Sequence, residues 1–195
     1  ADGVIVSLTS FPARIGSLWI VIETLLRQTY KPDKIILWLA NSQFESLEEL
    51  PIRLRKLMNR GVEIRFCDDI RSHKKYYYTM KNYPEHTVIT VDDDTFYPEN
   101  LVESLIVTSQ KYPNTICCNL AHKMTFDNNG NILPYIKWDS GSQGCNTPSD
   151  VLVPVGCEGV LYPPGSLNEK IFDKEQIYQL CPLADDLWLK AMATL

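Results

Sequence analysis

Residues 87–94 read Thr-Val-Ile-Thr-Val-Asp-Asp-Asp, a short uncharged run followed by three consecutive acids. The run is rich in β-branched residues, which predicts a buried strand. Two carboxylates about 6 Å apart repel each other by about 3 kcal/mol at an effective dielectric near 20, so a cation is expected beside them. Carboxylate oxygens suit Mg²⁺ or Mn²⁺ better than a soft metal. A metal site is therefore favoured over a solvated acidic turn that caps the helix expected from Pro98.

The direction of the three acids follows from the strand that precedes them. In an extended chain Asp92 and Asp94 point to one side and Asp93 points to the other. We therefore expect the acids to divide between a metal ion and a second partner, such as a ribose.

The first half of the chain alternates between strands and helices. Strands are expected at 4–9, 34–39, 62–66 and 87–91, and helices at 19–30, 47–60, 74–82 and 98–111. This alternation predicts an α/β fold with a doubly wound, mostly parallel sheet. Polar pairs or runs follow three of the strands, namely Thr9-Ser10, Asp68-Asp69 and Asp92 to Asp94. Ligands bind at the carboxyl ends of such strands, so these side chains are expected to converge on one site.

After residue 115 the pattern changes. The sequence predicts a hairpin of 116–126 and 132–138 around an Asp-Asn-Asn-Gly-Asn turn, followed by a polar loop at 139–150. An extended segment at 151–162 and helices near 174–180 and 184–193 complete the chain. We therefore expect a single domain, residues 1–195, whose second half is a mixed sheet.

Composition and charge narrow the class of protein. The chain has 195 residues, a formal charge of −5 and 45% hydrophobic residues. An acidic balance argues against a nucleic-acid surface, and no stretch reaches the roughly 18 apolar residues of a membrane span. Six scattered cysteines without a C-x-x-C pair indicate reduced thiols. We expect a cytoplasmic protein without a transmembrane segment, and peripheral contact with a membrane stays open.

Common phosphate-binding signatures are absent from the sequence. Neither a P-loop nor a G-x-G-x-x-G turn occurs. A phosphatase of the haloacid-dehalogenase type would need Asp-x-Asp-x-Thr after its first strand, whereas Thr95 comes one place early and after the fourth strand. Gly130 stands at the wrong offset for an EF-hand.

Four segments in order carry a family resemblance. They read Val-Ile-Val-Ser-Leu-Thr-Ser-Phe-Pro-Ala-Arg at 4–14, Ile-Thr-Val-Asp-Asp-Asp at 89–94, a Gly-containing stretch at 156–165, and Ala-Asp-Asp-Leu-Trp-Leu at 184–189. The chain resembles the glycosyltransferase A-fold enzymes, specifically the inverting, family-2-like group, over nearly its whole length. This resemblance implies a Rossmann-like glycosyltransferase A-type fold, with a nucleotide-binding half at 1–114 and an acceptor and catalytic half at 115–195.

The resemblance also implies roles for residues of the first half. Thr9, Ser10 and Arg14 look like the loop that cradles the nucleotide. Asp68 or Asp69 resembles the acid that hydrogen-bonds the base. The position of Lys75 corresponds to that of a cation near the nucleotide, and Lys74 fits that position equally well.

The acids after the fourth strand and near the C-terminal end complete the implied site. Asp92 would face the ribose or the metal, with Asp93 beside it, and Asp94 would ligate the metal that bridges the pyrophosphate. Asp186 matches the position of the general base. Asp185 stands where the family has Glu, which leaves open which of the two acids accepts the proton.

The implied reaction needs these residue types. A bound Mn²⁺ or Mg²⁺ stabilises the leaving nucleoside diphosphate, and a carboxylate accepts the proton of the attacking hydroxyl. The resemblance implies a nucleotide-sugar donor, most simply a UDP-sugar, a carbohydrate or other hydroxyl acceptor, inversion at the anomeric carbon, and a setting in bacterial surface-polysaccharide biosynthesis. A nucleotidyltransferase and a non-catalytic nucleotide-sugar-binding domain are the alternatives.

Three further features stay open at this level. For Trp188 two alternatives stay open, namely stacking on a sugar ring and packing in the core. Gly156 and Gly159 would let a ligand approach the backbone closely, or mark a strand bulge. The Lys-Lys-Tyr-Tyr-Tyr run at 74–78 predicts a phosphate and base patch or a half-buried helix with equal weight.

Overall fold

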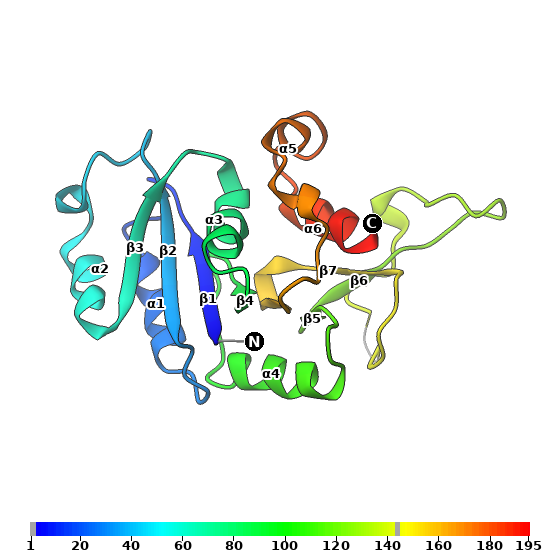
Figure 1. Ribbon diagram of the computed structural model, residues 1–195, viewed down its shortest axis with the longest axis horizontal. Coiled ribbons are helices and arrows are strands. Elements are labelled where there is room, and N and C mark those ends of the chain that lie inside the picture. Colours follow the sequence, from blue (N-terminus) through cyan, green and yellow to red (C-terminus); the bar gives the residue numbers. More distant parts are fainter. Residues whose placement is uncertain (1–2, 143–144) are drawn as a thin grey trace.

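The computed structural model describes residues 3–142 and 145–195, and a six-stranded sheet forms its centre (Figure 1). The strand order is β3-β2-β1-β4-β8-β5. The first four strands are parallel, and β8 runs antiparallel to both β4 and β5. The strands are β1 (Val4–Thr9), β2 (Lys34–Ala40), β3 (Val62–Cys67), β4 (Thr87–Thr90), β5 (Cys117–Cys118) and β8 (Val160–Tyr162). The mixed, mostly parallel sheet predicted from the sequence is confirmed.

Helices cover both faces of the parallel part of the sheet. The helices are α1 (Leu18–Leu26), α2 (Ile52–Lys56), α3 (Lys74–Asn82), α4 (Leu101–Lys111), α5 (Lys174–Leu180) and α6 (Asp185–Thr194). Leu8 of β1 packs in the core that α1, α2 and α4 share, whereas Ile5 and Trp38 contribute to the opposite face, beside Tyr78 of α3. Successive strand residues point to opposite faces, so one apolar strand supplies both layers.

The predicted helix at 47–60 is wrong as a single element. The structure has a 3₁₀ turn at Leu47–Glu49, the short helix α2, and a second 3₁₀ turn at Leu57–Arg60. Pro51 explains the break, because proline lacks an amide donor and forces the residue before it into an extended conformation. Leu50 has φ −74° and ψ 146° accordingly. Gly61 ends the segment with φ +95°, as the sequence predicted.

The second half contains a small two-stranded sheet of β6 (Ala121–Lys123) and β7 (Leu152–Pro154). An arm of residues 124–138 extends away from the main sheet (Figure 1). The predicted turn is present at its tip, but only one bridge, between Phe126 and Ile132, joins its two sides. Ile132 and Ile136 are exposed, so no layer buries a face of a longer hairpin. The predicted strand 132–138 is therefore wrong, and Tyr135–Lys137 forms a 3₁₀ turn instead.

The other predictions for the second half were partly correct. The extended segment 151–162 is interrupted by a 3₁₀ turn at Gly156–Glu158, with β7 before it and β8 after it. Both C-terminal helices are present. Part of the predicted polar loop, residues 143 and 144, lies outside the described residues. All six cysteines are free thiols, and no helix in the described ranges has the length and apolar character needed to cross a bilayer.

Candidate active site

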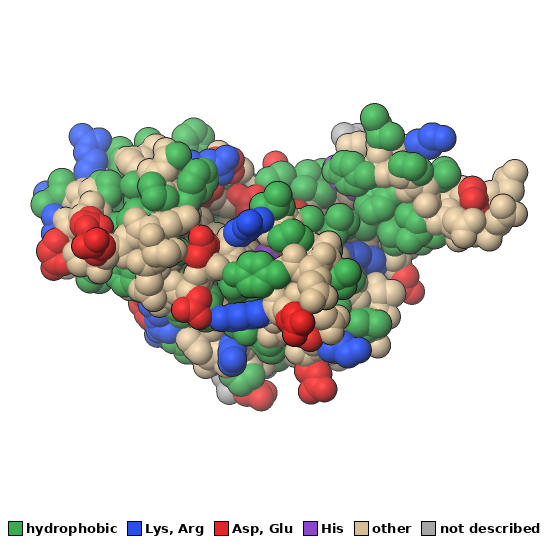
Figure 2. All heavy atoms as spheres, turned by 90° about the horizontal axis from the view of Figure 1, so that it is seen from above, with side chains coloured by type: hydrophobic (Ala, Val, Ile, Leu, Met, Phe, Trp, Pro, Cys, Tyr) green, Lys and Arg blue, Asp and Glu red, His purple; other side chains and the backbone are tan. Residues whose placement is uncertain are grey.

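Polar side chains gather at the carboxyl edge of the parallel strands. Figure 2 looks toward this edge and shows acidic and basic side chains close together in the middle of the molecule, between the sheet and the arm. Strand β4 stops at Thr90, and the acids after it leave the extended conformation. The predicted alternation is therefore wrong: Asp93 and Asp94 contact one cation, while Asp92 contacts another.

The first group of contacts joins the loop after β1 to the acids. Arg14 Nη1 lies 2.7 Å from Asp93 Oδ1 and 2.8 Å from Asp94 Oδ2. Ser10 Oγ donates to Asp93 Oδ2 at 2.6 Å. Both carboxylate oxygens of the buried Asp93 therefore contact the loop after β1, so Asp93 links that loop to the loop after β4. Thr9 lies apart from the group, since its hydroxyl donates to the carbonyl of Trp38 at 2.8 Å.

The second group centres on Lys75 in the first turn of α3. Its ammonium lies 2.7 Å from Asp92 Oδ1 and 2.8 Å from Asp185 Oδ2, and its side chain is only 5% exposed. The contact with Asp185 is a close ion pair without the alignment of a good hydrogen bond. One buried cation thus connects the acids after β4 to the first turn of α6, and residues from the two halves of the chain form one site.

The pKa values of the two acids in the first turn of α6 shift in opposite directions. Burial raises the pKa of Asp186 to about 6, and the neighbouring charge of Asp185 adds to this effect. Burial would also raise the pKa of Asp185, but the positive charge of Lys75 outweighs this effect, so that the pKa of Asp185 lies below its usual value. A carboxylate whose pKa lies near the working pH is the better proton acceptor. The structure therefore favours Asp186 over Asp185 as the candidate base, the question that the sequence left open.

Gly156 sets the position of Asp186. Its amide donates to Asp186 Oδ2 at 3.0 Å. A Cβ at position 156 would lie 2.9 Å from Asp186 Oδ1 and 3.0 Å from Lys75 Nζ. The close approach expected here is thus made by the site's own side chains, whereas Gly159, with φ +83°, approaches Leu101.

The third group lies at the end of β3. Lys74 Nζ lies 2.7 Å from Asp69 Oδ1, and Lys174 Nζ of α5 lies 3.0 Å from Asp68 Oδ2. Lys74 and Lys75 are adjacent in α3, but Lys74 belongs to this third group and Lys75 belongs to the second group. Two strand spacings, about 10 Å, separate the ends of β3 and β1. Asp68 and Asp69 share the edge with Ser10 and Arg14 but make no direct contact with them in the described residues.

The carboxylates suit a metal that takes few protein ligands. No three acidic, histidine or cysteine side chains of the described residues converge on one point. Asp92 and Asp94 each keep one oxygen without a hydrogen bond to the described part of the chain, and their side chains are 31% and 48% exposed. Mg²⁺ is typically held by one or two carboxylates together with substrate phosphates. Asp92 and Asp94 fit this pattern.

Two aromatic residues have roles that the sequence did not reveal. The Tyr97 hydroxyl accepts from the amide of Asp92 at 2.8 Å and donates to the carbonyl of Cys157 at 3.1 Å. Tyr97 therefore ties the acids to the turn that bears Gly156, and only its place five residues after Asp92 hinted at this contact. Trp188 is 2% exposed in the core of α3, α5 and α6, so it does not offer a face to a sugar. The tyrosines Tyr76 and Tyr77 are buried as well.

Comparison with solved structures supports the fold assignment. The structure of S. aureus TarS 1–349 in complex with UDP matches with a TM-score of 0.59 and 11% identity over 95% of this chain and 53% of that chain. A second crystal structure of S. aureus TarS 1–349 matches with a TM-score of 0.54 and 15% identity, over 97% of this chain and 54% of that chain. This chain thus spans about half the length of the TarS fragment. A 4-diphosphocytidyl-2C-methyl-D-erythritol synthase matches with a TM-score of 0.52 and 10% identity, over 88% and 79%.

These similarities define the class of the fold. The chain has the glycosyltransferase A-type fold that the sequence resemblance implied, and a nucleotidyltransferase-type synthase shares its architecture. Neither a protein-family model nor a curated protein sequence matches the chain.

Proposed function

We propose that the protein is a metal-dependent glycosyltransferase that moves a sugar from a nucleotide-diphosphate donor to a hydroxyl acceptor with inversion. The single observation that carries this proposal is the position of Lys75 between Asp92 and Asp185. This position supports the proposal because Lys75 links Asp92, a candidate metal ligand, to Asp185, the neighbour of the candidate base Asp186, and the reaction needs a metal ligand and a base close together.

The donor would lie along the carboxyl edge of the sheet. In this proposal Asp68 or Asp69 would hydrogen-bond the base, and Ser10 and Arg14 would lie on the side of the ribose and phosphates. Asp92 and Asp94 would hold Mn²⁺ or Mg²⁺, which neutralises the charge that develops on the diphosphate. The UDP in one similar structure makes a UDP-sugar the first donor to test.

The proton follows a simple path in this proposal. The acceptor oxygen bonds to the anomeric carbon, and the bond from that carbon to the diphosphate breaks with its electron pair. Asp186 takes the proton of the attacking hydroxyl. The amide of Gly156 holds the Asp186 carboxylate in place while this occurs.

Binding calorimetry tests the donor site. UDP, GDP, CDP and dTDP are titrated with Mn²⁺ and with EDTA into wild type, Asp94→Ala and Asp139→Ala. We expect one nucleotide to bind in a metal-dependent manner, at least about tenfold more weakly in Asp94→Ala. Asp139→Ala makes the same chemical change at an exposed acid outside the site and should bind like wild type. Absence of metal-dependent binding of any nucleotide contradicts the proposal.

Analysis of the reaction products separates a glycosyltransferase from a nucleotidyltransferase and from a non-catalytic binding domain. The likeness to the 4-diphosphocytidyl-2C-methyl-D-erythritol synthase favours a nucleotidyltransferase as the second candidate. That enzyme would consume a nucleoside triphosphate and release pyrophosphate. The loop Ser-Phe-Pro-Ala-Arg after β1 lacks the glycines and repeated cations expected for that reaction. Binding that persists in Asp186→Asn while transfer disappears would also exclude a purely binding domain.

A further inference from the structure

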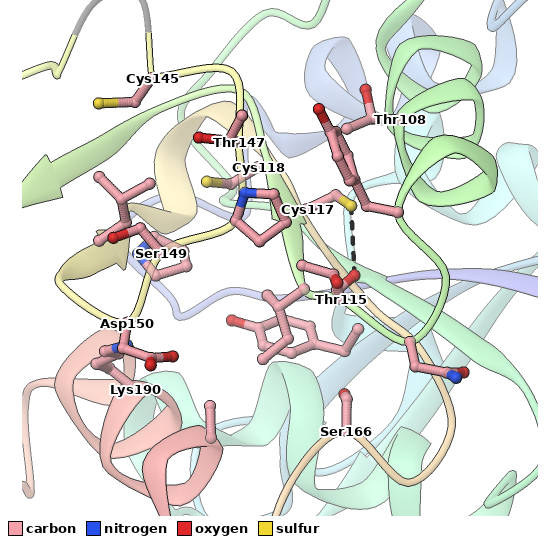
Figure 3. A pocket seen from close by; sticks show the side chains of 18 of the residues that line it. Thr108, Thr115, Cys117, Cys118, Cys145, Thr147, Ser149, Asp150, Ser166 and Lys190 are labelled. Carbon is pink, nitrogen blue, oxygen red and sulfur yellow. Dashed lines mark hydrogen bonds between the residues drawn. The ribbon is translucent and has the colours of Figure 1, made fainter.

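A cavity of about 620 Å³ opens beside the candidate active site (Figure 3). Its walls come from the end of α4, from β5, from residues 145–150 and from α6. Cavities of roughly 300–1,000 Å³ are typical of small-molecule sites. Asp186 is among the lining residues, so the cavity borders the carboxylate to which we assign proton transfer.

One face of α6 supplies both the base and a wall of the cavity. Asp186, Leu189, Lys190 and Ala193 all line it, and their spacing of three and four residues places them on one side of a helix. Asp186 Oδ2 accepts the amide of Gly156, whereas Oδ1 has no hydrogen-bond partner in the described part of the chain. That oxygen is therefore available to a hydroxyl.

The lining suits a ligand that has many hydroxyls and no net charge. The cavity is lined by five hydroxyl side chains, those of Thr108, Thr115, Thr147, Ser149 and Ser166 (Figure 3). The hydroxyls of Thr108 and Thr115 donate to backbone carbonyls and can still accept from a ligand. Among the charged lining residues, two lysines, Lys111 and Lys190, are balanced by Asp150 and Asp186. Asp150 and Lys190 lie toward the same end of the cavity in Figure 3, and the charge of Asp150 acts on Lys190. An anionic ligand would meet as many carboxylates as ammonium groups.

Two side chains have hydrogen-bonding capacity that the described residues do not use. The Ser166 hydroxyl is buried and has no partner among them, and a buried polar group left unpaired costs about 1–3 kcal/mol. Lys190 forms no ion pair with the described residues, and its burial lowers its pKa. Ligand hydroxyls would satisfy both groups.

We propose that this cavity binds the acceptor as a neutral sugar or polyol and presents one of its hydroxyls to Asp186. The inference rests on the proposed function for the identity of the reaction, but the binding of a neutral carbohydrate at this place can be measured without turnover.

The test uses paired substitutions on α6. Ala191 and Ala193 are both exposed on α6, but only Ala193 lines the cavity. Ala193→Trp should fill the cavity, and Ala191→Trp adds the same side chain outside it. Amide chemical shifts are followed by NMR while glucose, galactose, N-acetylglucosamine, lactose, glycerol and ribitol are added, with glucose 6-phosphate as the anionic probe.

We expect at least one neutral probe to shift the amides of lining residues in wild type and Ala191→Trp, and to bind at least about tenfold more weakly in Ala193→Trp. Ser149→Trp, on the loop wall, should have the same effect and covers the case in which Ala193→Trp fails to fold. The inference is overturned if no neutral probe shifts these amides, if the filled variants bind normally, or if only the phosphorylated sugar binds.

Nucleotide titration keeps this inference separate from the proposed function. Both Ala193→Trp and Ser149→Trp should bind the nucleotide and Mn²⁺ as wild type does, because neither residue belongs to the donor site. Loss of sugar binding with intact nucleotide binding supports the acceptor cavity. Absence of nucleotide binding in wild type, with sugar binding present, would contradict the glycosyltransferase function alone.

Discussion

The ammonium of Lys75 lies 2.7 Å from Oδ1 of Asp92 and joins the first turn of α3 to the acids that follow β4. The same nitrogen reaches Asp185 at the start of α6. Because Lys75 is buried among carboxylates, its pKa is raised well above its usual value: the charges of Asp185 and Asp92 outweigh the effect of burial. The charge of Lys75 therefore fixes Asp92 close to Asp185 at the start of α6.

Replacement of Lys75 by Met should strongly destabilise the protein. It leaves the buried Asp185 without its counter-ion, a change that typically costs about 3–5 kcal/mol. Urea unfolding followed by circular dichroism measures the loss. Lys34→Met is the control, because Lys34 pairs with Glu63 at 2.6 Å while both side chains are about one-third exposed. Such a surface pair contributes at most about 1 kcal/mol. Equal losses in the two variants would contradict the central role of Lys75.

Gly156→Ala should slow transfer without unfolding the protein. The new methyl group would meet Asp186 Oδ1 at 2.9 Å and Lys75 Nζ at 3.0 Å, so the carboxylate must move away from its position. We expect a fall in kcat of about 100-fold, since small displacements of a catalytic group have effects of this size. Gly16→Ala is the control, because a Cβ there meets nothing within 4 Å. Wild-type kcat in Gly156→Ala would show that the position of Asp186 does not matter.

The pH dependence of transfer should report Asp186. The base must be deprotonated to accept a proton, and its pKa is raised to about 6 by burial and by Asp185. Activity should therefore rise with pH, with a midpoint near that value for kcat/KM. The measurement is the initial rate between pH 4.5 and 8.5 at low acceptor concentration. A midpoint near 4, typical of an exposed carboxylate, would argue that another group accepts the proton.

Asp186→Asn should stabilise the folded protein at alkaline pH while it removes activity. The folded pKa lies above the unfolded value of about 3.9, so protonation favours the folded state. This contribution is fully present below about pH 4 and is lost as the pH rises through about 6. The neutral Asn side chain escapes that loss, and a gain of about 1–3 kcal/mol is expected at pH 8. Unfolding curves at pH 8 and pH 4 check this, because the gain should vanish at pH 4.

Local sequence patterns were sufficient for the parallel strands and most helices. Runs of β-branched residues such as those of β4 form strands because they pack on both faces of a buried sheet. The predicted helix at 47–60 was wrong because its apolar spacing was given more weight than the effect of Pro51. The arm at 124–138 was also mispredicted, since its apolar residues, such as Ile132 and Ile136, have no layer against which to pack.

The site was predictable in part. The acids at 92–94 and 185–186 could be recognised from the sequence. Several carboxylates directly after a buried strand, or at the start of a helix, repel one another unless a cation or a ligand lies nearby. The contacts of Tyr97, Gly156 and Lys190 were not predictable, because they depend on segments that are distant in the sequence and meet only in the fold.

The sequence by itself determined the α/β class and the candidate residues of the site, because strand and helix periodicity and the chemistry of acidic side chains are local properties. Only the tertiary structure decided how those residues are paired. It assigned Arg14 to Asp93 and Asp94, Lys75 to Asp92 and Asp185, and the higher pKa to Asp186. Charge pairing and burial depend on distances between segments from the two halves of the chain, and folding alone sets those distances.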